Sequence, residues 1–227
     1  MGDARHLIEI RGIGKDYVNG GATVNAIRHM DFAIDDGEFV SIMGQSGSGK
    51  STLLSILGGL NRPTSGQVLV DTLDLYALSS EQRADFRSEY IGFIFQSFQL
   101  IPYLTVKENI KLPMSITGVR DREQEHRAQG VLTKVGLAGK ADRLPDQLSG
   151  GEQERVAIAR AIVNSPPILL ADEPTGNLDS RTADDVMALL TQLNHDGQTI
   201  IMVTHNPGMG AHTHRTIHIQ DGLCQTN

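Results

Sequence analysis

Short apolar runs alternate with longer amphipathic segments along the chain, and this alternation predicts an α/β fold. The runs at residues 39–43, 168–171 and 199–203 are short and β-prone, which is typical of parallel strands covered on both faces. Residues 7–11 instead alternate apolar and polar positions, which predicts a strand with one covered face. Further strands are predicted at 27–34, 67–70, 90–95, 216–219 and 223–225, the last two as a hairpin around Asp221 and Gly222.

Helical patterns fill most of the remaining chain. They predict helices at 51–57, 81–88, 106–114, 121–135, 150–163 and 182–194, with Ser79 or Ser80 capping the second and Ser180 the last. The turn at 35–37 is expected to form a hairpin into the strand at 39–43. Between 97 and 164 the pattern predicts helices joined by polar connections and interrupted by Pro102 and Pro113. We therefore expect one domain over 1–227, with a core of 1–96 and 165–227 and an inserted helical subdomain of 97–164.

A glycine-rich stretch follows the strand at 39–43 and precedes a helix. It fits the pattern Gly, any four residues, Gly-Lys-Ser/Thr, with the residues Gly44, Gln45, Ser46, Gly47, Ser48, Gly49, Lys50 and Ser51, and Thr52 after it. Backbone N–H groups of such a loop point inward at phosphate oxygens, and the next helix adds its positive end. An ordinary glycine-rich turn would lack the preceding strand and the following helix. The stretch predicts a phosphate-binding loop in which Lys50 reaches the β- and γ-phosphates.

Polar residues follow the other apolar strands: Gln96, then Asp172 with Glu173, then His205. Because the carboxyl ends of parallel strands meet at one edge of a sheet, these side chains are expected to share a crevice with the loop. Oxygen ligands suit Mg²⁺, so Ser51 and Asp172 are predicted metal ligands, with Gln96 contacting the metal or an attacking water. Glu173 is predicted to polarise water for attack on the γ-phosphate, with His205 hydrogen-bonding the phosphate or the water.

A second glycine pair lies about a hundred residues further along. Ser149 and Glu152 have the spacing of a capping box, which predicts that a helix begins here. The capping box does not explain Gly150 and Gly151, because glycine in a first helical turn lowers stability. Close approach of a ligand to the backbone would explain them, so Ser149, Gly150 and Gly151 are predicted to form a second anion site.

Composition narrows the classes of partner. The 227 residues carry a formal net charge of −7, which argues against a nucleic-acid partner, and Cys224 is the one cysteine. No segment approaches the ~20 continuous apolar residues of a membrane span, so any work at a membrane would need another chain to supply the span. Tyr17 is predicted in a polar, glycine-rich loop, either as a packing anchor or as a platform for a flat base.

These motifs together resemble the ATP-binding cassette (ABC) ATPases, over nearly the whole chain. Residues 148–153 are similar to the signature motif, 44–51 to Walker A, 168–172 to Walker B and 177–179 to the D-loop. In the same comparison Glu173 resembles the catalytic glutamate, Gln96 the Q-loop glutamine, His205 the switch histidine, and Tyr17 the aromatic residue that stacks on adenine. The resemblance implies a P-loop NTPase fold with a RecA-like, mostly parallel core sheet, an N-terminal antiparallel β subdomain and an inserted helical subdomain.

The resemblance also implies partners. ATP and Mg²⁺ are the expected ligands, and the expected active form is an ATP-dependent homodimer in which the signature of one copy faces the phosphate loop of the other. An integral membrane permease would hold the chain at the cytoplasmic face of the inner (plasma) membrane. The apolar residues at 98–104 are candidates for the docking surface, or for packing within the helical subdomain.

Within the family, the sequence is similar to the lipoprotein-releasing and macrolide-exporter branch in the segments 57–60, 63–66, 91–98 and 172–179. It is also similar to the cell-division ATPase of this branch. Non-transport ABC ATPases, of cell-division or DNA-repair type, are the alternative. The chain has no room for the coiled coils of chromosome-type members and no second cassette, and Cys224 alone is too few cysteines for a zinc module. A small-molecule kinase would have no use for the signature or for His205. His212, His214 and His218 could form a metal site, and the alternative is that they are solvated surface histidines.

Overall fold

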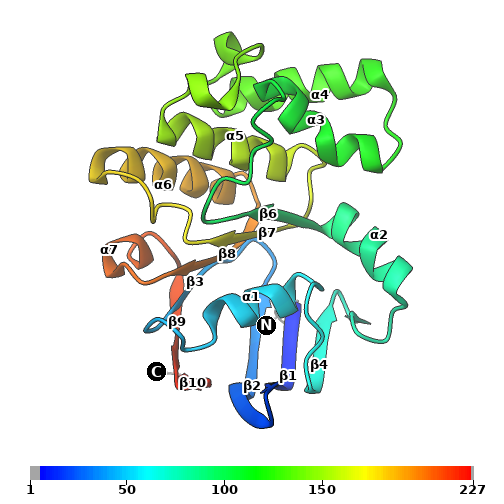
Figure 1. The fold of residues 1–227 in the computed structure, drawn as a ribbon, viewed down its shortest axis with the longest axis vertical. Coiled ribbons are helices and arrows are strands. Elements are labelled where there is room, and N and C mark those ends of the chain that lie inside the picture. The colour runs from blue at the N-terminus through cyan, green and yellow to red at the C-terminus, as the bar shows by residue number, and fades with distance from the viewer. Residues whose placement is uncertain (1–5, 226–227) are drawn as a thin grey trace, which may run out of the picture.

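The computed structural model describes residues 6–225, which form a continuous ten-stranded sheet with helices on both of its faces (Figure 1). Its strand order is β5-β4-β1-β2-β10-β9-β3-β8-β7-β6. Antiparallel pairing joins the strands of the first part, which are β1 (His6–Asn19), β2 (Ala22–Asp35), β4 (Ser65–Val70) and β5 (Leu73–Asp74). The predicted antiparallel N-terminal part is therefore present.

The second part of the sheet is mostly parallel. Its adjacent parallel strands are β3 (Phe39–Met43), β8 (Thr199–Thr204), β7 (Ile168–Asp172) and β6 (Ile91–Ile94). On the other side of β3 lies β9 (Arg215–Gln220), also parallel, followed by β10 (Leu223–Gln225), which pairs antiparallel with β9 and parallel with β2. This arrangement confirms the α/β fold with a mostly parallel core sheet, and the C-terminal hairpin.

Helices cover the sheet from two sides (Figure 1). They are α1 (Lys50–Leu57), α2 (Ser80–Tyr90), α3 (Val106–Ile116), α4 (Asp121–Lys134), α5 (Gly150–Ile162), α6 (Ser180–His195) and the short α7 (Pro207–Gly210), with 3₁₀ turns at Ala138–Lys140 and Pro145–Gln147. The helix α5 contacts α3, α4, α6 and β6, so it joins the helical layer to the sheet.

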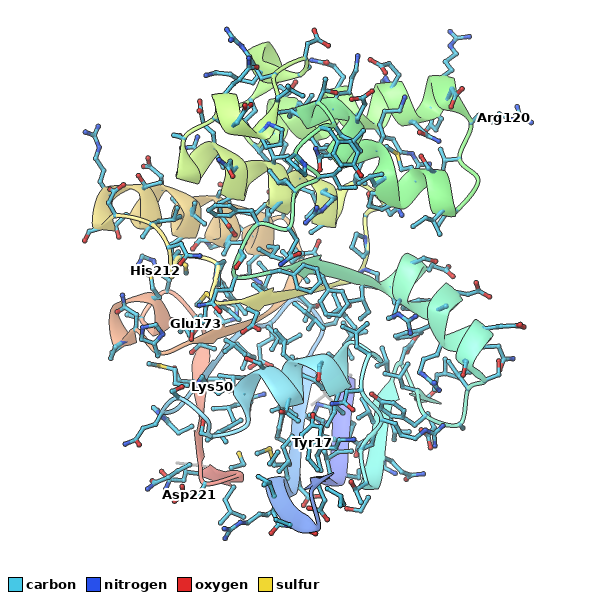
Figure 2. The ribbon with its side chains drawn as sticks, in the orientation of Figure 1. Tyr17, Lys50, Arg120, Glu173, His212 and Asp221 are labelled. Carbon is cyan, nitrogen blue, oxygen red and sulfur yellow. The ribbon has the colours of Figure 1, made fainter. Side chains whose placement is uncertain are left out.

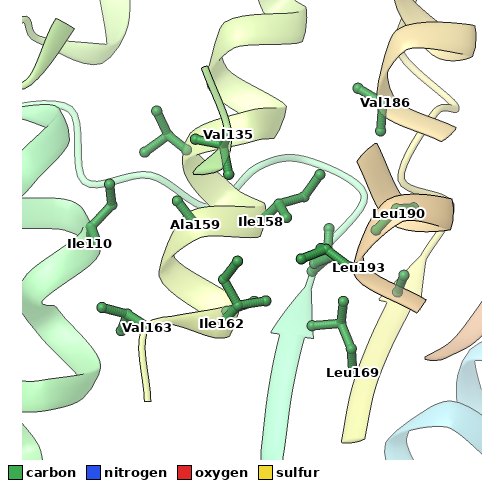
Figure 3. Close-up of a cluster of buried hydrophobic side chains, with 14 of the residues drawn as sticks. Ile110, Val135, Ile158, Ala159, Ile162, Val163, Leu169, Val186, Leu190 and Leu193 are labelled. Atoms are coloured by element: carbon green, nitrogen blue, oxygen red, sulfur yellow. The ribbon is translucent and has the colours of Figure 1, made fainter. Parts of the chain in front are cut away.

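The central strands have a hydrophobic core on each face, as their continuous apolar runs predict. Leu169 and Ala171 of β7 belong to one core together with residues of α3, α5 and α6 (Figure 3). Ile168 and Leu170, which alternate with them, belong to a second core together with residues of α1, β1 and β2. The two cores fix β7 between the helical layer and α1, and so fix the residues that follow the strand.

Two predictions about the N-terminal half are wrong. Tyr17 lies in β1 and not in a loop, because β1 continues to Asn19 through register shifts near Ile10, Ile13 and Lys15. These bulges interrupt the two-residue alternation that marks a strand in sequence. The turn at 35–37 joins β2 to β3 without making a hairpin, because β10 and β9 lie between the two strands.

The cap of α6 also differs from the prediction. The helix begins at Ser180, two residues earlier than predicted, and its cap is Asp179. The Asp179 carboxylate accepts hydrogen bonds from the Thr182 backbone N–H (3.1 Å) and from Thr182 Oγ1 (2.6 Å). Both Asp and Ser are good cap residues, so sequence alone does not choose between neighbours of these types.

Candidate functional site

A cavity of about 550 Å³ lies where β3, β6, β7 and β8 end. It is lined by Ala26, Ser46, Gly47, Gly49, Lys50, Ser51, Thr52, Gln96, Glu173 and His205. Since the four strands are parallel neighbours, their carboxyl ends meet at one edge of the sheet, as predicted. Figure 2 shows Lys50 and Glu173 at this edge. Ala26 of β2 is a lining residue that the sequence does not reveal, because only the folding of β2 past the loop brings it there.

Close backbone contacts shape the phosphate loop. Gly49 has φ +103°, and a Cβ atom at this position would lie 2.3 Å from the Ala26 carbonyl oxygen. Both facts require glycine immediately before α1. The Lys50 ammonium, on the first residue of α1, donates to the carbonyl oxygens of Gly44 (2.9 Å) and Gln45 (2.8 Å). The positive charge therefore lies inside the loop, beside the end of a helix where anions bind.

Ser51 and Asp172 lie next to each other, although 121 positions separate them in sequence. The Ser51 hydroxyl donates to Asp172 Oδ1 at 3.3 Å. Burial raises the pKa of the Asp172 carboxyl, the neighbouring Glu173 adds to this, and the Ser51 hydrogen bond opposes it. A carboxylate held in a poorly solvated place beside a hydroxyl is suited to bind a cation.

The side chains of Glu173 and His205 are in contact at the cavity, where His205 Nδ1 lies 2.7 Å from Glu173 Oε2. Glu173 has φ +49°, an uncommon conformation for a residue with a side chain, and its backbone N–H donates to the Val203 carbonyl of β8 at 2.9 Å. Left-handed backbone right after β7 turns the Glu173 side chain away from the strand and toward β8. Strain of this kind is often found at functional sites.

Gln96 and Tyr17 differ in how they relate to this cavity. Gln96 lines it, and the Gln96 carbonyl oxygen accepts a hydrogen bond from Asn177 Nδ2 at 2.7 Å. Asn177 was found in sequence only as part of a motif, and its contact with Gln96 is new. Tyr17 is outside the lining residues: its hydroxyl contacts Asn61 Nδ2, and Lys15 Nζ lies 5.0 Å from its ring centroid.

Ser149, Gly150 and Gly151 also lie outside the cavity lining, at the start of α5. The predicted capping box is present, since the Ser149 N–H donates to Glu152 Oε2 (3.0 Å) and the Glu152 N–H to Ser149 Oγ (3.3 Å). A Cβ atom at Gly151 would lie 2.2 Å from Thr182 Cγ2 of α6, whereas one at Gly150 would have its nearest neighbour at 3.4 Å. Helix packing therefore explains Gly151, and ligand approach is needed only to explain Gly150.

This contact predicts a selective loss of stability. We expect Gly151→Ala to lower the free energy of unfolding by about 1–3 kcal/mol through overpacking. Adding Thr182→Ser should restore it, because serine keeps the hydroxyl that Asp179 binds and lacks Cγ2. Gly150→Ala is the matched control and should leave stability unchanged or slightly higher. Urea unfolding of the parent and these three variants measures this, and a Gly151→Ala protein as stable as the parent would refute the contact.

The C-terminal histidines do not come together as a site. Within residues 6–225, no group of three or more His, Cys, Asp and Glu side chains is arranged to hold a metal ion. His214 Nδ1 instead accepts a hydrogen bond from the Phe39 N–H at 3.1 Å, which ties the segment after α7 to the start of β3.

Comparison with known proteins places the chain in a family. The profile of the family "ABC transporter" matches residues 27–176. The ABC transporter ATP-binding protein YknY of Bacillus subtilis (strain 168), itself uncharacterized, is 46% identical over 216 residues, 95% of this chain and 94% of YknY. The lipoprotein-releasing system ATP-binding protein LolD of Syntrophotalea carbinolica is 45% identical, over 95% of this chain and 96% of LolD. The macrolide export ATP-binding/permease protein MacB of Rhodopseudomonas palustris (strain BisB18) is 44% identical, over 97% of this chain but 34% of MacB.

Among solved structures, the ATP-binding cassette MJ0796, a dimer in a post-hydrolysis state bound to ADP and Pi, matches with a TM-score of 0.88. It is 42% identical, and the match covers 96% of this chain and 97% of the cassette. The chain belongs to the ABC transporter family, as an ATP-binding subunit with ATPase activity. This confirms the resemblance found in sequence. In the part of the chain described, no helix is both long and apolar enough to cross a membrane.

Proposed function

We propose that this chain hydrolyses ATP as a homodimer around two ATP molecules and thereby drives a conformational change in a membrane permease. The observation that carries the proposal is the Glu173–His205 pair, 2.7 Å apart, at a cavity lined by the phosphate loop. A fixed carboxylate beside a phosphate site is what activation of water against a terminal phosphate requires.

The reaction follows from the placement of the side chains. The oxygen of a water molecule bonds to the γ-phosphorus while the bond from phosphorus to the β–γ bridging oxygen breaks, giving ADP and phosphate. Glu173 accepts the proton of that water, and His205 orients the Glu173 carboxylate through its Nδ1. Lys50 and the loop N–H groups offset charge on the β- and γ-phosphates. In this proposal Tyr17 stacks on adenine.

The residues beside the loop also fit a bound Mg²⁺. Ser51 Oγ and Asp172 Oδ1 are oxygen atoms that can ligate a metal ion, and they lie only 3.3 Å apart. Mg²⁺ takes one or two protein oxygens together with phosphates and waters. We assign Ser51, Asp172 and Gln96 to this ion, which when bound would neutralise phosphate charge. Mg²⁺ is thus part of the proposal, together with ATP.

The remaining half of the site is assigned to a second copy. Ser149, Gly150 and Gly151 are outside the cavity that holds Lys50 and Glu173, so one copy does not bring them to its own loop. The start of α5 offers N–H groups and a positive helix end to a phosphate. The dimeric state of the related cassette MJ0796 supports a second copy as the source of these residues.

Complementation between two inactive variants tests this composite site. Lys50→Ala destroys the loop of one copy and Ser149→Arg blocks the start of α5, so each variant alone should lose ATPase activity. A heterodimer of the two retains one intact site, and an equal mixture should therefore regain about a quarter of the parental rate, since half the dimers are mixed. A mixture that stays as inactive as its components would refute the composite site.

We further propose that the permease docks in an apolar groove between the core and the helical subdomain of residues 97–164. A cavity of about 430 Å³ lies there, at β6, α2 and α3. Leu60, Phe95 and Ile116 line it and remain 53%, 38% and 82% exposed. Of the segment 98–104 named from sequence, Tyr103 is exposed but Leu100 packs against the core, so the exposed apolar surface is centred on the groove.

A charged side chain placed in the groove should prevent this chain from binding the permease. Ile116→Asp is expected to abolish co-purification with the proposed membrane permease, because an apolar contact surface would acquire a desolvated carboxylate. The control is Leu73→Asp, since Leu73 is 45% exposed on β5, away from the groove. Unchanged co-purification of Ile116→Asp would exclude the groove as the docking surface.

The names of two relatives support a finer assignment. LolD is named as a lipoprotein-releasing system protein and MacB as a macrolide export protein. Each match covers at least 95% of the length of this chain. We propose that this chain serves a permease of that branch, peripheral to the cytoplasmic face of the inner membrane.

A further inference from the structure

Arg160 joins the signature helix α5 to the segment that follows Gln96. Its guanidinium donates to the carbonyl oxygens of Phe98 (2.7 Å) and Gln99 (2.5 Å), two residues 62 and 61 positions away in sequence. Arg160 is partly buried, and it also lines the groove with Leu60 and Phe95. One side chain thus lies between the helix that begins with Ser149 and the strand end that carries Gln96.

The backbone that Arg160 binds is in an unfavourable conformation. Phe98 has φ +57° and Gln99 has φ +51°, and two consecutive left-handed residues other than glycine need support from outside the segment. A planar guanidinium suits this task, because its fork of N–H groups can bind two adjacent oxygens at once. Arg160 is therefore placed to fix the path of the chain two residues after Gln96.

Other contacts restrain the same stretch from both sides. Asn177 Nδ2 binds the Gln96 carbonyl at 2.7 Å. Further along, Asn109 Oδ1 accepts from the Ile101 N–H at 2.7 Å, and Asn109 Nδ2 donates to the Leu104 carbonyl at 3.0 Å. The segment from Gln96 to Leu104 is therefore held at both of its ends. If Arg160 no longer bound the Phe98 and Gln99 carbonyls, we expect the resulting shift of the backbone to displace Gln96.

An unusual residue of α5 acts on Arg160. The Glu154 side chain is 1% exposed, and its Oε1 has no hydrogen-bond partner among the residues described. Burial also lowers the pKa of the Arg160 guanidinium, and an ionised Glu154 carboxylate would oppose this. Glu154 and Arg160, two ionisable residues of α5, therefore both lie in poorly solvated places. The Arg160 guanidinium uses its hydrogen bonds on the carbonyl oxygens of the segment that follows Gln96.

We propose that Arg160 is a positioning residue for Gln96: it holds the Phe98–Gln99 backbone so that the Gln96 side chain lies at the phosphate cavity. Because Arg160 also lines the groove assigned to the permease, a segment docked there would touch the side chain that positions Gln96. This inference rests on the proposed ATPase site. It adds a residue of α5, outside the cavity, on which catalysis depends.

A double-mutant cycle between Arg160→Met and Gln96→Ala tests the inference, with the full chain, ATP and Mg²⁺. Arg160→Met should lower kcat about 10–100-fold while changing the KM for ATP less than about threefold, because the phosphate loop is untouched. In the Gln96→Ala background, Arg160→Met should lower kcat no further. Arg160→Lys should fall between, since lysine keeps the charge and loses the fork.

Arg155→Met is the matched control on the same helix, because Arg155 approaches Asp185 of α6 (3.8 Å) and not the Gln96 segment; it should retain the parental kcat. Equal losses from Arg160→Met with and without Gln96 would overturn the inference, as would a parental kcat in Arg160→Met. Should Arg160→Met not fold, the cycle is run with Arg160→Lys and read by the same criteria. A parent chain that fails to hydrolyse ATP would instead refute the proposed function.

Discussion

Replacing Glu173 by glutamine is expected to slow ATP turnover about 10²–10⁴-fold, the range that a general base contributes. Glutamine has the shape of glutamate and its amide oxygen can still accept from His205 Nδ1, which lies 2.7 Å from the carboxylate. What it loses is the ability to take a proton from water. ATP binding should persist, so dimers with ATP trapped between them should accumulate and be visible by size-exclusion chromatography with ATP and Mg²⁺.

The control for this variant is Glu89→Gln, an equally conservative change at an exposed position of α2. It should retain the parental rate and the parental monomer–dimer balance. Two results would count against the role of Glu173: turnover within about threefold of the parent, far outside the range of a lost base, or a chain that stays monomeric with ATP and Mg²⁺.

Glu154 should make the folded protein less stable as the pH rises. Burial raises the pKa of the Glu154 carboxyl from its ordinary value of 4.5 to about 8, and the charge of Arg160 opposes this. Between these two values the folded state keeps a proton that the unfolded chain has released. The stabilising effect is therefore complete below pH 4.5 and is lost as the pH rises toward 8.

The size of this effect follows from the interval between the two pKa values. Each pH unit lowers the free energy of unfolding by up to about 1.4 kcal/mol, hence up to about 5 kcal/mol in all. Thermal unfolding from pH 5 to pH 9 should show the melting temperature of the parent falling by roughly 10 °C relative to Glu154→Gln. Glutamine has no proton to lose, so its own curve lacks this component.

Glu152→Gln is the matched control for the pH series. The hydrogen bond from the Ser149 N–H, helped by Lys140, lowers the pKa of Glu152, so this carboxylate stays ionised across the range. Removing it should shift the melting temperature by a similar amount at every pH. If the parent and Glu154→Gln have parallel curves, Glu154 does not hold a proton in the folded state at neutral pH.

Local rules were enough to predict the loop and the strand ends. The run 39–43, the glycines after it and the helix behind them follow from residues close in sequence, and the structure has β3 and α1 in those places. Convergence of Gln96, Glu173 and His205 required one further rule, that parallel strands end at a common edge. Strand order confirms it, because β3, β8, β7 and β6 are neighbours.

Contacts that depend on how whole layers of the fold pack together were beyond prediction from the sequence. No pattern around Ala26 or Arg160 shows that one lines the cavity and the other binds the Phe98 and Gln99 carbonyls. Nor does any pattern show that α6 packs against Gly151, where a Cβ atom would lie 2.2 Å from a methyl group of Thr182. Both failures have the same cause: the partner atom is supplied by another element, and its position depends on how whole layers pack.

The Gly151–Thr182 contact has a consequence for motion. With no space for one carbon atom between them, the first turn of α5 and the first turn of α6 cannot slide past each other without losing their packing. Asp179, which caps α6, is bound to the same Thr182. The signature residues and the loop before α6 should therefore move as one rigid body, so that a displacement of either one, for example at the proposed dimer interface, would also displace the other.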